Sequence, residues 1–328
     1  MARGLIRAAL LFFTLVTVVL AVLAWGRAQF ERPGPLERET TVILARGIGL
    51  AGIAATLAEE GVIESPLVFT VGVRLIGADR RLQAGEYAFP AAVSAREVVD
   101  VLMNGRIVVR RVTVPEGLTS MQVVALLEAT DGLTGSVDRV PEEGSLLPET
   151  YHFSFGDRRA ELIARMQEAM PATLTELWAD RAPDLPFTRP KDAQILASIV
   201  EKETALEEEH RRIAGVFINR LRRNMRLQSD PTVVYGITGG AGPLDRPLTR
   251  EDLERKTPYN TYLISGLPPG PIANPGRAAI AAVLNPAETD ELYFVADGKG
   301  GHAFARTLEE HNRNVARWHR LRGEGGDQ

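Results

Sequence analysis

The sequence predicts an α+β protein with one N-terminal transmembrane helix, small α/β units and a mainly helical C-terminal domain with short strands. Three observations predict this class: an uncharged apolar run, a strand–turn–helix pattern that occurs twice, and helical periodicity in the second half. The expected segments are an N-terminus (1–7), a transmembrane helix (8–25), a linker (26–40), two α/β units (41–105 and 106–158), a helical domain (159–322) and a flexible tail (323–328).

The apolar run AALLFFTLVTVVLAVLAW fills residues 8–25 without a charge. As a helix it would be about 27 Å long, close to the thickness of a hydrocarbon core. Arg3 and Arg7 precede it, and Trp25 ends it where an interfacial aromatic belongs. A cleaved signal peptide is the rival interpretation, but the run is long for one and no A-x-A site follows. We expect an uncleaved single-pass anchor in the cytoplasmic membrane, with the N-terminus in the cytoplasm and the rest outside.

The strand–turn–helix pattern covers residues 41–63 and again residues 111–133. In each copy, alternating apolar residues (Val42 and Leu44, then Val112 and Val114) predict a strand, a glycine predicts a turn, and apolar residues three to four apart predict a short helix. A similar tag follows each copy, GEYAFP at 85–90 and PETYHF at 148–153. The two copies predict two related small units, although this supersecondary pattern is common enough to recur by coincidence.

Helical patterns dominate from about residue 160. The second helical block, up to the stop signal Asn224, has a start signal in Pro190 and Asp192. Segments rich in Gly, Pro and Asn follow, with interleaved polar and aromatic residues of the kind that build a binding cleft from loops. The strand LYFVAD, a GKGGH turn and an amphipathic helix through Trp318 close the chain.

Composition narrows the function classes. The chain has 328 residues, a net charge of -4, 45% hydrophobic residues and no cysteine. The length predicts two or three compact units, and the mild acidic balance argues against a nucleic-acid binder. Without cysteine, disulfides and thiolate chemistry are excluded. The five histidines are scattered and no H-E-x-x-H occurs, which argues against a metal site; neither a serine-hydrolase motif nor a phosphate loop is present.

Two glutamates stand out in the segment ILASIVEKETA, residues 195–205. At about 100° per residue, Glu203 falls in the middle of an apolar stripe roughly 140° wide, whereas Glu201 falls opposite, on a face of small residues. A carboxyl group in apolar surroundings has a raised pKa, as a general acid needs near neutral pH. The structural alternative is that Glu203 pairs with Arg211 or Arg212 of the next helix. The stripe comprises Ile195, Leu196, Ile199, Val200 and Leu206.

A family resemblance decides between the two glutamates. The block ASIVEKETA…VFINRLRRNMRLQSDPTVVYG, with TPYNTYLISGLPPGPIANPG and LYFVADGKGGHAFARTLEEHN, resembles the YceG/MltG family of membrane-anchored endolytic murein transglycosylases over most of residues 197–314. The resemblance implies a LysM-like domain at 41–105 and a lysozyme-like catalytic transglycosylase domain at 159–322. Ile199 to Thr204 fits the register I-x-x-x-E-S of lytic transglycosylases, with Glu203 as the catalytic acid and Glu201 as the second choice.

The resemblance also implies substrate, partners and further site residues. The substrate would be the glycan strand of peptidoglycan, cleaved with 1,6-anhydro ends and without a cofactor, and the partners would be peptidoglycan synthases and the elongation or division machinery. Two alternatives stay open: a muramidase-type hydrolase that uses Glu203 with Asp230, and a non-catalytic peptidoglycan-binding scaffold. Asp230 could instead be a turn or N-cap residue, and Asn260 and Asn274 plain turn residues. The residues expected to bind sugar are Gln228, Ser229, Tyr235, Asn260, Tyr262 and Asn274.

Overall fold

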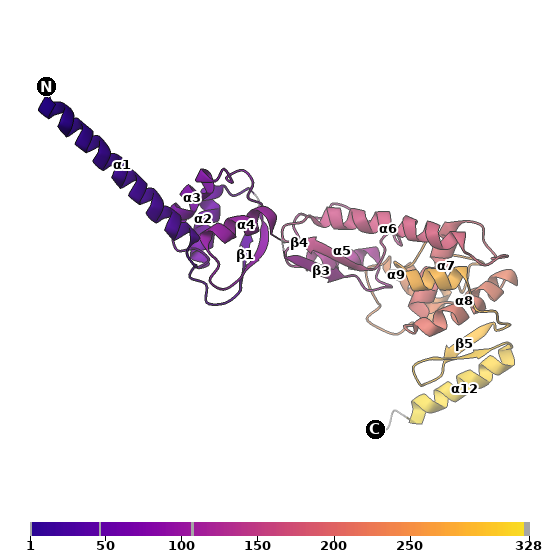
Figure 1. The fold of residues 1–328 in the computed structure, drawn as a ribbon. Coiled ribbons are helices and arrows are strands. Elements are labelled where there is room, and N and C mark those ends of the chain that lie inside the picture. The colour runs from indigo at the N-terminus through magenta and orange to yellow at the C-terminus, as the bar shows by residue number, and fades with distance from the viewer. Residues whose placement is uncertain (1, 46, 106–107, 325–328) are drawn as a thin grey trace. The chain divides into compact units, whose positions relative to one another are not determined.

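The computed structural model describes residues 2–45, 47–105 and 108–324. The chain divides into two compact units, Met1–Arg110 with His152–Asp157, and Arg111–Tyr151 with Arg158–Gln328. The elements are coloured along the chain in Figure 1. In order they are α1 (Ala2–Glu31), β1 (Thr40–Leu44), α2 (Leu50–Glu59), α3 (Pro66–Leu75), β2 (Gly85–Phe89), α4 (Ala95–Asn104), β3 (Val109–Thr113), α5 (Ser120–Glu128), β4 (Thr150–Ser154), α6 (Arg159–Ala179), α7 (Pro190–Glu203), α8 (Glu207–Arg222), α9 (Asp230–Thr238), α10 (Arg250–Glu254), α11 (Arg277–Leu284), β5 (Tyr293–Ala296), β6 (His302–Ala305) and α12 (Leu308–Glu324).

The N-terminal helix α1 is longer than the apolar run that predicts it. Within the described residues, one helix is long and apolar enough to cross a membrane, over residues 9–31. The helix continues to Glu31, so the first six residues of the predicted linker are helical. That stretch contains no proline, and Pro33, which cannot continue a helix, follows shortly after its end.

The first unit packs three short helices against a two-stranded sheet. Strands β1 and β2 are antiparallel, with Val42 opposite Tyr87. The predicted strand–turn–helix is present, since β1 leads through Gly47, at φ +86°, into α2. Its core is apolar and closed, with Leu57 and Phe69 fully buried. The LysM-like character of this unit stays a prediction.

The second strand–turn–helix is formed by β3, Gly117 at φ +73° and α5. Strand β3 pairs with β4, and the boundary between the two compact units runs through these strands. Helix α5 has a capping box in which Thr119 and Gln122 bond one another's backbone N–H groups. The residues from Arg111 to Tyr151 therefore fold in the same compact unit as the later helices; residues 106–107 lie outside the described residues.

The second unit is built around α7, which packs against α6, α8 and α11. The helical block predicted from Pro190 to Asn224 is in fact two helices. Thr204 is extended, at φ −146° and ψ 142°, and its hydroxyl accepts the backbone N–H of Leu206 at 3.1 Å. Helix α8 then starts with three glutamates in its first turn, where negative charge is favourable.

The chain ends in the antiparallel hairpin β5–β6 followed by α12, drawn in yellow in Figure 1. Gly298 and Gly300 adopt positive φ in the turn between these strands. Phe294 of β5 meets Phe217 of α8 edge-to-face at 5.7 Å, which fixes the hairpin to the helical core. Helix α12 includes residues 323 and 324 of the predicted flexible tail, and residues 325–328 lie outside the described residues.

Candidate active site

Helix α7 places Glu203 at its last residue, at the edge of the core of the second unit. All residues from Ile195 to Val200 are buried. The predicted apolar stripe is present, but the small-residue face is enclosed as well, and Ser198 Oγ accepts the backbone N–H of Ile272 at 3.0 Å. The middle of the helix is covered on both faces, whereas its carboxyl end is partly open, with Glu203 partly exposed.

The carboxyl group of Glu203 is held by Ser229. The hydroxyl of Ser229 donates a hydrogen bond to Glu203 Oε1. Ser229 is the N-cap of α9, where a serine oxygen usually accepts a backbone N–H of the first turn, yet here it makes no such cap bond. The backbone N–H of Ser229 donates to Thr261 Oγ1 at 2.9 Å. The residue is thus oriented toward Glu203 instead of capping its own helix.

Burial raises the pKa of Glu203 from 4.5 to about 7. The hydrogen bond from Ser229 lowers it, the charge of Asp230 raises it, and the charges of His302 and Arg220 lower it, each by less than burial does. The carboxyl group is therefore protonated in a large share of molecules at neutral pH, as a general acid requires.

The ion pairs that would make Glu203 merely structural are formed elsewhere. Arg211 Nε donates to the backbone oxygen of Asn285 at 2.9 Å, and Arg212 pairs with Glu291. Both guanidinium groups face the segment that follows α11. The alternative of a pair between Glu203 and one of these arginines is therefore wrong.

Asp230 and Tyr262 form a second polar pair beside Glu203. Tyr262 Oη donates to Asp230 Oδ1 at 2.6 Å. Asp230 is exposed, whereas burial, together with the Asp230 and Glu203 carboxylates, raises the pKa of Tyr262. The charge of Asp230 also acts on Glu203. The structure thus gathers one acid with a raised pKa, one exposed carboxyl group and one phenol at the start of α9.

The charges of Arg220 and His302 act on Glu203, and the sequence patterns singled out neither residue for this site. Arg220 is buried and donates to the backbone oxygens of Leu292, at 2.6 Å, and Leu227, at 2.8 Å. His302 Nδ1 lies 2.6 Å from Glu209 Oε2. A signal for His302 was present in the GKGGH turn, but only folding brings that turn to the end of α7.

Glu209 links the hairpin to the residue that follows the acid. Its carboxylate accepts the backbone N–H of His302 at 2.9 Å and the hydroxyl of Thr204 at 3.3 Å. Since Thr204 directly follows Glu203, this carboxylate fixes both the end of α7 and the hairpin turn. Glu209 therefore positions the surroundings of Glu203 without contacting it.

Along the chain, Gln228 precedes Ser229 and Asp230, and Tyr235 follows them in α9. Gln228 is exposed and adopts a left-handed backbone at φ +48°, which costs strain in a residue other than glycine. Its backbone N–H donates to the oxygen of Thr261 at 3.2 Å. Tyr235 lines a cleft of about 440 Å³ along α9, and its ring lies 4.8 Å from that of Tyr259. Asp230 lines the same cleft.

The three consecutive residues 201–203 point to three different places. Glu201 Oε2 accepts the backbone N–H of Gly276, at the N-terminus of α11, at 2.9 Å. Lys202 Nζ donates to the oxygen of Gly117 at 3.2 Å. Glu203 alone reaches Ser229. The carboxylate of Glu201 is therefore occupied at a helix N-terminus, a favourable place for a negative charge.

Asn260 and Asn274 are enclosed within the fold. Both have 0% of their surface exposed. The side-chain nitrogen of Asn260 donates to the oxygens of Leu253 and Arg255, and its oxygen accepts the N–H of Tyr262. The side chain of Asn274 accepts the N–H of Leu146 at 2.9 Å and donates to the oxygen of Leu118 at 3.0 Å. Their polar atoms bond the chain itself.

The family model of the YceG-like family matches residues 42–317. The chain belongs to the YceG-like family. Glu203, Ser229, Asp230, Tyr262 and His302 all lie within the matched YceG-like range. Among the residues that the structure describes, no group of three or more His, Cys, Asp or Glu side chains is arranged to hold a metal ion.

Proteins of known name are similar to this chain over most of its length. The endolytic murein transglycosylase of Bacillus subtilis strain 168 is 31% identical over 322 residues, which cover 88% of this chain and 88% of that protein. The endolytic murein transglycosylase of Streptococcus pneumoniae serotype 2 is 29% identical over 85% of this chain and 58% of its own length. A crystal structure of a yceG-like protein from Listeria monocytogenes superposes with a TM-score of 0.54 and 30% identity, covering 84% of this chain and 99% of that one.

Proposed function

We propose that this chain is a membrane-anchored endolytic lytic transglycosylase that cleaves the β-1,4 bond between N-acetylmuramic acid and N-acetylglucosamine. The observation that carries the proposal is Glu203, a partly exposed acid with a pKa of about 7 at the end of a buried helix, held by Ser229 beside Asp230. The names of the family's relatives, endolytic murein transglycosylase, support the same activity.

In the first step, protonated Glu203 donates its proton to the glycosidic oxygen as the bond to C1 breaks. The leaving N-acetylglucosamine departs as an alcohol, and positive oxocarbenium character grows at C1 of the muramoyl sugar. Since the carboxyl group is protonated in a large share of molecules near pH 7, the acid is available without a second proton donor.

In the second step, the Glu203 carboxylate takes the proton of the C6 hydroxyl of the same muramoyl sugar. The C6 oxygen attacks C1 and closes the 1,6-anhydro ring, and Glu203 returns to its protonated form. No water is consumed, so one carboxyl group serves as acid and then as base. The Ser229 hydroxyl stabilises the carboxylate between the two steps by its hydrogen bond.

We assign sugar binding to the exposed side of the site. Gln228 and Asp230 are exposed, and Tyr235 and Tyr262 are partly exposed, so these four side chains can reach a glycan strand. For Asn260 and Asn274 we propose a structural role in place of the sugar binding that the sequence predicts. Because both are enclosed and bonded to the chain, we propose that they hold the loops that carry the sugar-binding residues.

The products distinguish the transglycosylase from a muramidase-type hydrolase. Asp230 is the observation that favours the second candidate, since it stands beside Glu203 as a hydrolase's second carboxylate would. We expect mass spectrometry of purified glycan digested by the wild type to show anhydro ends, and Asp230→Asn protein to keep forming them. Products that have gained one water, and that disappear with Asp230→Asn, would establish the hydrolase. Binding without any cleavage would establish the non-catalytic scaffold instead.

The pH profile should respond to the two neighbours of Glu203 in opposite directions. kcat/KM is expected to fall as pH rises through about 7, because the acid must start protonated. Ser229→Ala removes a bond that lowers the pKa, so the alkaline limb moves to higher pH. Asp230→Asn removes a charge that raises the pKa, so the limb moves to lower pH. Initial rates of anhydro-product release across the pH range measure both shifts.

A matched control for these shifts is Asp245→Asn, which removes an exposed carboxylate from a loop outside the site. Its alkaline limb should coincide with that of the wild type. Shifts of the same sign for Ser229→Ala and Asp230→Asn would mean that the limb does not report Glu203.

We propose that α1 anchors the chain in the cytoplasmic membrane, with the N-terminus in the cytoplasm and the catalytic domain outside. The support is a helix over residues 9–31 that is long and apolar enough to span a bilayer. On this proposal the nascent glycan strands beside the membrane are the substrate. Peptidoglycan synthases and the elongation or division machinery are the expected partners.

A further inference from the structure

Helix α3 of the first unit is apolar on the side that faces away from its core. Phe69 and Val73 are fully buried, yet Leu67 and Leu75 are 73% and 70% exposed. Leu67, Val71 and Leu75 are four residues apart, so they form one stripe along the helix. A short surface helix of a soluble domain would normally carry polar residues on this face.

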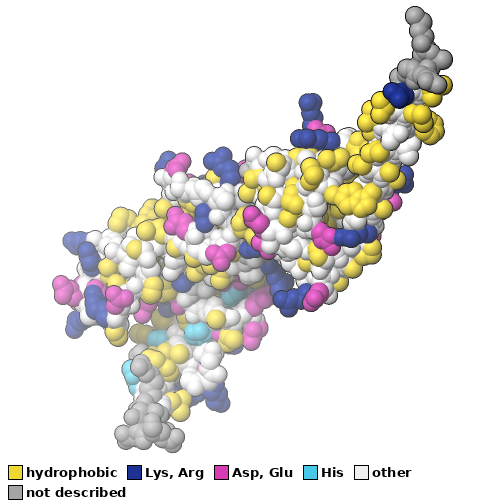
Figure 2. All heavy atoms as spheres, turned by 90° about the vertical axis from the view of Figure 1, so that its left-hand side faces the viewer, with side chains coloured by type: hydrophobic (Ala, Val, Ile, Leu, Met, Phe, Trp, Pro, Cys, Tyr) yellow, Lys and Arg dark blue, Asp and Glu magenta, His cyan; other side chains and the backbone are white. Residues whose placement is uncertain are grey.

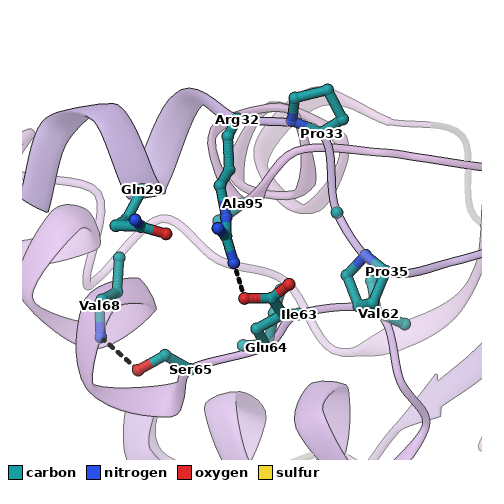
Figure 3. A pocket seen from close by; sticks show the side chains of 11 residues that line it. Gln29, Arg32, Pro33, Pro35, Val62, Ile63, Glu64, Ser65, Val68 and Ala95 are labelled. Carbon is teal, nitrogen blue, oxygen red and sulfur yellow. Dashed lines mark hydrogen bonds and ion pairs between the residues drawn. The ribbon is translucent and has the colours of Figure 1, made fainter.

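The stripe lies beside the membrane helix because α1 is packed on α3. Phe30 near the end of α1 is buried against Gly72, where a Cβ atom would lie only 2.5 Å from the phenyl ring. Figure 3 shows a second connection: Arg32, which follows α1, pairs with Glu64, just before Ser65 caps the start of α3. The exit of the span and the start of α3 are thus held together.

A groove of about 830 Å³ runs between the two helices. One wall is the outer end of the apolar span, with Val22, Leu23 and Trp25. The other wall carries the exposed stripe of α3. In Figure 2 hydrophobic side chains cover the exposed N-terminal helix and continue onto the adjoining surface of the first unit. The apolar surface is therefore continuous from the span to α3.

We propose that α3 lies in the membrane interface and that lipid acyl chains of the bilayer crossed by α1 fill this groove. The inference rests on the anchor proposed above and extends the membrane contact to the folded domain. Lipid is the occupant because half of the groove is the span itself, which acyl chains already surround. A partner protein would have to displace them.

The polar residues around the stripe suit a lipid headgroup layer. Trp25 is exposed at the outer end of the span, where interfacial aromatics are enriched. Arg74 near the end of α3, and Arg80 and Arg81 after it, are exposed. Guanidinium groups at this depth attract the phosphates of anionic lipids. An apolar helix face with arginines in and just after its last turn is compatible with an interfacial helix.

The test uses the absence of cysteine from the chain, which lets a single introduced cysteine carry a fluorophore. Full-length Leu75→Cys protein, labelled with an environment-sensitive dye, is reconstituted into vesicles of phosphatidylethanolamine and phosphatidylglycerol that contain a nitroxide lipid. We expect several-fold stronger lipid quenching at position 75 than at the matched control Ile43→Cys, an exposed aliphatic on strand β1 outside the groove.

A second variant tests whether the stripe is the cause. In a Val71→Cys protein, the added changes Leu67→Glu and Leu75→Glu should abolish lipid quenching at position 71. Both leucines are largely exposed, so the core is left intact. If the dye in the labelled Leu75→Cys protein is quenched by aqueous iodide and not by the nitroxide lipid, the proposal is overturned. It is also overturned if the dye becomes protected from iodide only at high protein density, which indicates a second copy, or only when membrane proteins are added, which indicates a protein partner.

The label Val18→Cys separates this inference from the anchor on which it rests. Position 18 lies within the span and is exposed. If position 18 is quenched by lipid but position 75 is not, α3 is free of the membrane and only the further inference fails. If position 18 is not quenched, the anchor itself is wrong.

Discussion

Glu203→Gln protein is expected to release anhydro-muramoyl fragments about 10²–10⁴ times more slowly than the wild type, the range that one general acid–base residue usually contributes. The amide keeps the shape of the side chain and an oxygen that can accept the Ser229 hydroxyl. It cannot donate a proton to the glycosidic oxygen or take one from the C6 hydroxyl, so both proposed steps are lost. Product release from purified glycan, followed by chromatography and mass spectrometry, measures the rate.

Glu201→Gln is the matched control, two residues away in the same helix. Its amide retains an oxygen for the backbone N–H of Gly276, so α11 keeps its partner and the rate should stay within about tenfold of the wild type. If Glu201→Gln abolished cleavage and Glu203→Gln did not, the assignment of the acid would be reversed. If both proteins cleaved at the normal rate, neither glutamate would be catalytic.

Asn274→Ala is expected to lower the free energy of unfolding by about 1–3 kcal/mol, since it leaves the buried backbone N–H of Leu146 without a partner and removes the side-chain bonds to Leu118 and Ser120. The side chain bonds Leu146, Leu118 and Ser120, and so ties three segments together. Thermal unfolding of the purified protein in detergent measures the loss. Because Asn274 has no exposed surface, the KM of the folded fraction should change less than the stability does.

Asn312→Ala provides the comparison, as Asn312 is an exposed residue of α12. Alanine is a better helix former there, and the stability should change by less than about 0.5 kcal/mol. If the Asn274→Ala protein instead has unchanged stability and a strongly raised KM, Asn274 has the direct role in sugar binding that the sequence predicts.

The position of the candidate acid was predictable because local periodicity carries the relevant information. A glutamate in an apolar stripe is an anomaly that any helical projection reveals, and burial does raise its pKa. The extent of the burial was not predictable. Ala197 and Ser198 are small and would be tolerated on an exposed face, so their burial depends on α11, which lies far along the chain.

The partners of the acid came from contacts that are distant in sequence. Ser229 and Asp230 were singled out by motif, but that the hydroxyl of Ser229 bonds Glu203 instead of capping α9 is a matter of loop geometry. His302 and Arg220 reach the site through a hairpin and a buried helix position. No local pattern reports such pairs, because their spacing along the chain has no period.

By itself the sequence determined the apolar N-terminal helix, the two strand–turn–helix patterns and the family, and it singled out Glu203 as the candidate acid, since each depends on neighbouring residues or on a motif. Only the tertiary structure decided that α7 ends at that glutamate and that residues 201, 202 and 203 take separate partners. It also decided that Asn260 and Asn274 bond the chain itself, and that α3 turns an apolar stripe outward beside α1. These outcomes depend on which distant segments exclude water from a given side chain, and burial of that kind is a property of the packed fold.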